Sequence, residues 1–88
     1  MGPYDTEQQT RTEPMPTAVR SAARSDPGLA SILALDHMVG ACADAGVELG
    51  TYDRRILEWL AGLEPATVQV VIGLITRAAA TKATAEQA

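Results

Sequence analysis

The chain has 88 residues, of which 47% are hydrophobic and 20% are charged, and its net charge at pH 7 is −4. This length leaves room for one domain with a small core. The negative balance argues against a sequence-independent nucleic-acid binder, because such binding depends on Lys and Arg side chains that neutralise phosphate.

Residues 1–16, MGPYDTEQQTRTEPMP, combine a glycine and three prolines with many polar residues and show no apolar periodicity. This composition predicts a disordered arm. Residues 17–25, TAVRSAARS, have helix propensity and a capping threonine, but Val19 is their only large aliphatic side chain. They are therefore predicted to form either a marginal short helix or a linker.

A helical domain is predicted over residues 26–80, with its first helix over residues 27–45. Asp26 suits the N-cap, Pro27 suits the first helical position, and Gly46 suits the end of the helix. Helical spacing of large apolar side chains predicts which face of this helix is buried. That face consists of Leu29, Ile32, Leu35, Met38, Val39 and Cys42.

Two further helices are predicted over residues 52–61 and 65–80, joined by the corner Gly62-Leu63-Glu64. The first of them has apolar side chains at helical spacing, which we expect to face the core. These are Tyr52, Ile56, Trp59, Leu60 and Leu63. Residues 81–88 have helix propensity without an apolar stripe, so we expect them to form a frayed tail.

The last helix is apolar around about 200° of its circumference, whereas a surface helix needs only about 100°. We therefore expect it to be covered on more than one side. Its remaining sector has small residues at every seventh position, Ala66, Gly73 and Ala80. At these positions another helix could approach closely. The candidate interface residues on this helix are Ala66, Gln69, Val70, Gly73, Leu74 and Arg77.

The corner between the last two helices resembles a helix-turn-helix motif over about 20 residues. With Gly62 as the turn glycine, the buried positions of the motif fall on Leu57, Leu63, Val68 and Val71. The chain departs from the motif at Glu58, where the motif has a small residue. The resemblance implies a DNA-binding role, yet the outward positions of the second helix lack the cations that contact bases and phosphates. The candidate nucleic-acid contacts are Arg54, Arg55, Arg77 and Lys82.

No catalytic, cofactor or metal site is expected. Cys42 has the position of a core residue, where a thiol behaves as a small hydrophobe. His37 points away from it on the same helix, so the two do not form a nucleophilic pair. His37 and Asp44 share the outward side as a weak pH-sensitive patch, but a metal ion needs more ligands than these. The single cysteine and the absence of a hydrophobic signal after Met1 predict a cytoplasmic protein.

The sequence therefore predicts an all-α fold, namely a small three-helix bundle with a possible extra short N-terminal helix and a helix-turn-helix-like C-terminal hairpin. The longest apolar run is far shorter than the roughly 18–20 residues of a membrane helix. The expected function is that of a non-enzymatic protein-interaction module, which self-associates or docks on a protein partner through the apolar last helix. The alternative is a DNA-binding or transcription accessory protein. Frequent Ala with no Asn suggests a bacterial origin.

Overall fold

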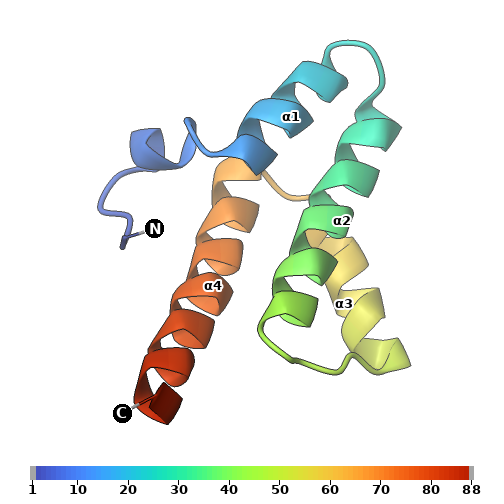
Figure 1. Ribbon diagram of the computed structural model, residues 1–88. Coiled ribbons are helices and arrows are strands. Elements are labelled where there is room, and N and C mark those ends of the chain that lie inside the picture. Colours follow the sequence, from blue (N-terminus) through green and yellow to red (C-terminus); the bar gives the residue numbers. More distant parts are fainter. Residues whose placement is uncertain (1, 88) are drawn as a thin grey trace.

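The computed structural model describes residues 2–87, and the side chains of residues 2–82. This part of the chain is all-α and contains no strand, which confirms the predicted fold class. α2 lies between α4 and α3, and α1 packs across one end of α2 and α4 (Figure 1). The elements in chain order are the 3-10 turn η1 (Glu7–Thr10), α1 (Pro14–Ala23), α2 (Pro27–Asp44), α3 (Thr51–Ala61) and α4 (Pro65–Gln87).

Local signals in the sequence place the boundaries of α2. The Asp26 side chain accepts hydrogen bonds from the backbone N–H groups of Gly28 at 3.0 Å and Leu29 at 3.3 Å, so it caps the start of the helix. At the other end, Gly46 has a φ of 76° and the Val47 N–H donates to the Cys42 carbonyl oxygen at 2.9 Å. This left-handed glycine stop was predicted from the sequence.

The buried face of α2 agrees only in part with the predicted one, because Met38 and Cys42 are buried as predicted but Leu29 and Ile32 are not. Ala30 and Ala34 are buried together with Met38, whereas Leu29 and Ile32 are exposed. α2 is apolar around most of its circumference, so the spacing of its largest side chains identified only part of the inner face. The small alanine side chains allow the neighbouring helices to lie close to the α2 backbone.

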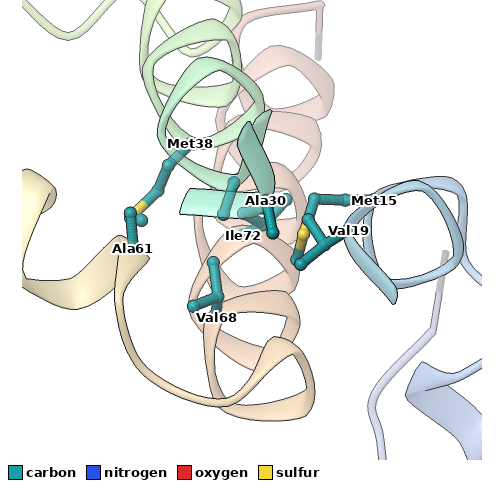
Figure 2. Packing of buried hydrophobic residues seen from close by; sticks show 8 residues of the cluster. Met15, Val19, Ala30, Met38, Ala61, Val68 and Ile72 are labelled. Carbon is teal, nitrogen blue, oxygen red and sulfur yellow. The ribbon is translucent and has the colours of Figure 1, made fainter. Parts of the chain in front are cut away.

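The core lies where α1, α2 and α4 meet, and α3 closes one side of it (Figure 2). Met38 has no exposed surface and extends towards Ala61 at the end of α3. α1 contributes Met15 and Val19, and α4 contributes Val68 and Ile72 to the same cluster. The core therefore depends on a few medium-sized side chains and several alanines, as expected for a chain without Phe.

The N-terminal part differs from the predicted disordered arm. The side-chain oxygen of Gln9 accepts hydrogen bonds from the backbone N–H groups of Asp5 at 2.6 Å and Thr6 at 2.9 Å, which closes the turn before η1. Thr10 and Met15 are fully buried against the rest of the chain. The predicted optional helix is present as α1 and begins at Pro14 rather than at residue 17. Single contacts, and not a repeated apolar pattern, order this N-terminal segment. The sequence therefore did not predict that it is ordered.

α4 extends past the predicted end at residue 80 and remains helical to Gln87. The predicted fraying of residues 81–88 lies partly outside the described residues, because Ala88 and the side chains of 83–88 are not described. α4 contacts α1, α2, α3 and η1, so the expectation that it is covered on more than one side is confirmed. In the described part of the chain, no helix combines the length and hydropathy needed to cross a lipid bilayer.

Candidate functional site

The predicted interface on α4 is largely covered by the N-terminal segment. Gln69 is 1% exposed, and its side-chain N–H donates to the Tyr4 hydroxyl oxygen at 2.9 Å. Ala66 and Gly73 are buried as well. The Arg77 guanidinium carbon lies 6.0 Å from the centre of the Tyr4 ring, and the Arg77 Nε donates to the Gly73 carbonyl oxygen at 3.1 Å. The small-residue stripe therefore packs within the chain over most of its length.

A docking residue must be exposed to solvent, and two of the six candidate interface residues on α4 are exposed. Leu74 is 56% exposed and Val70 is 38% exposed, and helix spacing puts both on the side of α4 opposite the core residues Val68 and Ile72. A shallow hollow between this side and the N-terminal segment is lined by Tyr4, Glu7, Glu64 and Val70 among others. The outer side of α4 thus retains a small apolar patch. Its polar neighbours Gln69 and Arg77 contact other parts of the same chain.

Tyr4→Phe is expected to lower the free energy of unfolding by about 1–3 kcal/mol, because it removes the acceptor of a buried amide N–H. Urea denaturation followed by circular dichroism measures this loss. Gln69→Leu in the Tyr4→Phe background should recover most of it, since both polar partners are then replaced by apolar groups. A Tyr4→Phe protein as stable as the wild type would show that Tyr4 does not rest on α4 in solution.

α3 presents to solvent the side chains that were predicted to be in the core. Tyr52 is 72% exposed and Trp59 is 65% exposed, and Ile56 and Leu63 are also exposed. The prediction for these four residues was therefore wrong. We call them the α3 stripe. α3 packs on the core through its other side, where Ala61 is buried and Leu57 and Leu60 are partly buried.

The physical reason is that α3 has apolar residues on two sides. Leu57 and Ala61 are one turn apart and fit the space beside Met38, which a bulky indole would overfill. Tyr52, Ile56 and Trp59 have spacings of four and three residues, which place them in one row on α3. Leu63 follows four residues later in the corner that ends α3, where its N–H donates to the Leu60 carbonyl oxygen at 2.9 Å. A continuous row of four exposed apolar side chains differs from the scattered apolar residues of an ordinary surface.

Charged residues border the α3 stripe. Arg55 and Glu58 lie on one side of the row, and Asp53 lies on the other. Asp53 accepts a hydrogen bond from the Gly50 N–H at 2.9 Å and so caps the start of α3. Arg55 and Glu58 form no ion pair with any side chain that the structure describes. Both are exposed and line a shallow surface hollow with Leu49, Thr51 and Arg54.

The candidate nucleic-acid residues have dissimilar surroundings. Arg54 and Arg55 are exposed on α3, next to Glu58. Arg77 is engaged with Tyr4 and with the backbone of its own helix. Lys82 borders a different hollow, which is otherwise lined by Ala45, Val47, Ile75, Ala78 and Ala79. The four cations therefore do not form a single basic surface on one helix of the hairpin.

The helix-turn-helix resemblance holds for the corner and not for the packing. The corner occupies residues 62–64 as predicted, between the end of α3 and the start of α4. However, α3 packs mainly on α2 and touches α4 only sparsely. Leu63, a buried position of the motif, is exposed, whereas Val68 is buried. The hairpin therefore lacks the close contact between its two helices that the motif requires.

The residues considered for chemistry lie apart. Cys42 is a free, buried thiol on the inner side of α2. His37 and Asp44 are exposed, and no hydrogen bond joins them in the part of the chain that is described. Among the described residues, no group of three or more His, Cys, Asp or Glu could hold a metal ion. The feature that sequence reasoning misplaced is thus the α3 stripe, whose row was recognised but assigned to the core.

The chain matches no protein-family model, and neither a curated protein nor a solved structure is significantly similar to it.

Proposed function

We propose that this protein is a small interaction module that binds another protein surface through the α3 stripe. The observation that supports this proposal is the exposure of Tyr52 and Trp59 in one row with Ile56 and Leu63. Trp and Tyr are the side chains that most often anchor protein interfaces, because they bury a large apolar area and lose little conformational entropy. Val70 and Leu74 on α4 provide a second, smaller apolar patch.

The α3 stripe replaces the α4 small-residue stripe as the main surface in this proposal. Gln69 is buried against Tyr4 of the chain's own N-terminal segment, and Gly73 is also buried within the chain, which removes the reason for a partner at that place. In contrast, Trp59 is 65% exposed in the described part of the chain. We further propose that the module is non-enzymatic and uses no cofactor, and that it acts in the cytoplasm, where the free thiol of Cys42 stays reduced.

A photo-crosslinking amino acid at position 59 is expected to form a discrete covalent product in cells of the native host. The reason is that Trp59 would lie at the centre of the interface, within reach of the bound surface. The product is detected by immunoblotting against the tagged protein and is identified by mass spectrometry. The same amino acid at Ser21, which is exposed on α1 away from the stripe, should give no such product.

The product must also depend on the rest of the row. Tyr52→Ser in the chain that carries the crosslinker should reduce the yield several-fold, because it removes a second apolar anchor from the same interface. A second copy of this chain or a different protein in the product would each support an interaction module. Equal products from positions 59 and 21, or none from either, would contradict the proposal.

A further inference from the structure

We propose that the α3 stripe binds the α3 stripe of a second copy of this chain, with the two α3 helices antiparallel about a twofold axis. This inference rests on the proposed function and names its partner. In such an isologous interface each residue meets a fixed partner position on the other copy. The midpoint between Tyr52 and Leu63 is also the midpoint between Ile56 and Trp59. One axis, passing between positions 57 and 58, therefore relates all four members of the stripe.

The sizes of the side chains favour this orientation. In the antiparallel pair, Trp59 faces Ile56 of the second copy and Tyr52 faces Leu63 of the second copy. Each aromatic ring then packs against an aliphatic side chain, so large and small residues alternate across the interface. In a parallel pair, by contrast, Trp59 would face Trp59 and Tyr52 would face Tyr52. Two rings at one level and two aliphatic side chains at the next would separate the helices unevenly.

The charges beside the stripe favour the same orientation. Arg55 and Glu58 lie on the same side of the row, three positions apart, and neither has an ion-pair partner among the described side chains. An antiparallel arrangement brings this side of one helix against the same side of the other. Glu58 lies farther from the contact line than Arg55, so the long Arg55 side chain of each copy must extend along the helix surface to pair with Glu58 of the other copy, at two equivalent sites. The opposed helix dipoles add a small favourable contribution.

The available area indicates how strong the pairing is. Tyr52 and Trp59 expose 72% and 65% of their surfaces. With aromatic side chains of 150–250 Å² and the two half-exposed aliphatic residues, the stripe offers roughly 400–500 Å² per copy. The total of roughly 800–1,000 Å² lies below the ~1,200–2,000 Å² of stable specific interfaces and is typical of weak, transient ones. The dimer should therefore form and dissociate reversibly, with a population that depends on protein concentration.

Analytical ultracentrifugation of the purified full-length protein, from ~10 µM to ~1 mM, tests the pairing. The wild type should shift from monomer to dimer within this range, and the fluorescence maximum of Trp59, the one tryptophan of the chain, should move to shorter wavelength with the same concentration dependence. Trp59→Ala should stay monomeric while its circular dichroism remains helical, because Trp59 is not part of the core.

Charge reversal tests the orientation. Arg55→Glu and Glu58→Arg should each raise the dimer dissociation constant about tenfold, because each places like charges opposite one another at two symmetric sites. The double variant Arg55→Glu/Glu58→Arg should return to within about twofold of the wild type. Arg54→Glu is the matched control. It makes the same change of charge on the same helix away from the stripe, and should leave the dissociation constant unchanged within about twofold.

Two results would overturn the inference. A wild type that remains a monomer at ~1 mM would exclude the second copy as occupant of the stripe. Dimerisation that the double charge reversal fails to restore would exclude the antiparallel register. Neither result bears on the crosslink at position 59 to a different protein, so failure of the pairing and failure of the proposed function are distinguishable.

Discussion

Met38→Ala is expected to lower the free energy of unfolding by about 2–5 kcal/mol, the range found when a buried Met, Leu or Ile is cut back to alanine. Met38 has no exposed surface and extends between α2 and the end of α3. Its removal leaves a cavity that the short side chains around it, including Ala34 and Ala61, cannot fill. At about 4–8 °C per kcal/mol for a domain of this size, the midpoint of thermal unfolding should fall by at least about 8 °C.

Ile32→Ala is the control for this loss. It removes a comparable aliphatic side chain from the same helix, but Ile32 is exposed, so the change should stay within about 0.5 kcal/mol. Thermal and urea unfolding of both variants, followed by circular dichroism, measures the two effects. Equal losses for Met38→Ala and Ile32→Ala would mean that α2 turns a different face to the core.

Local signals in the sequence predicted the ends of α2 and α3 and the start of α4 to within about one residue, but not the start of α1 or the end of α4. Asp26 and Gly46 bracket α2, and Pro65 begins α4, because capping and φ preferences act between residues that are near in sequence. The three-residue corner before Pro65 was also predicted correctly. These features need no knowledge of which helix packs on which, and one sequence is enough to find them.

The inner faces of the helices could not be predicted in the same way. α2 and α3 each have apolar residues on more than one side, so periodicity left a choice that only tertiary packing decides. In both helices small residues such as Ala34 and Ala61 take part in the buried side, and some larger side chains, such as Ile32 and Trp59, face outward. The sequence prediction weighted side-chain size, whereas close packing of short helices favours small side chains between them.

The N-terminal segment illustrates a second limit. Its contacts with α4 join residues far apart in the sequence, as in the hydrogen bond between Gln69 and Tyr4, and leave no local pattern. Polar composition alone predicted disorder. Because this segment covers the small-residue stripe of α4, the error also misplaced the candidate interface.

Ala34→Leu tests the claim that small residues determine how closely the helices of this bundle approach. Ala34 is 1% exposed and belongs to the core cluster. It lies on α2, the helix that contacts α1, α3 and α4. Three additional heavy atoms at this point force side chains from their rotamers and helices apart, so the free energy of unfolding should fall by about 1–3 kcal/mol or more.

Ala43→Leu makes the same substitution on the exposed side of α2 and should leave the stability within about 0.5 kcal/mol of the wild type. Urea denaturation of both variants gives the comparison, and near-ultraviolet circular dichroism reports whether the packing around the core stays fixed. If leucine at position 34 were neutral or stabilising, the core would contain unfilled space beside α2. The burial of alanines in place of Leu29 and Ile32 would then need an explanation other than close helix packing, because a larger side chain would fit there equally well.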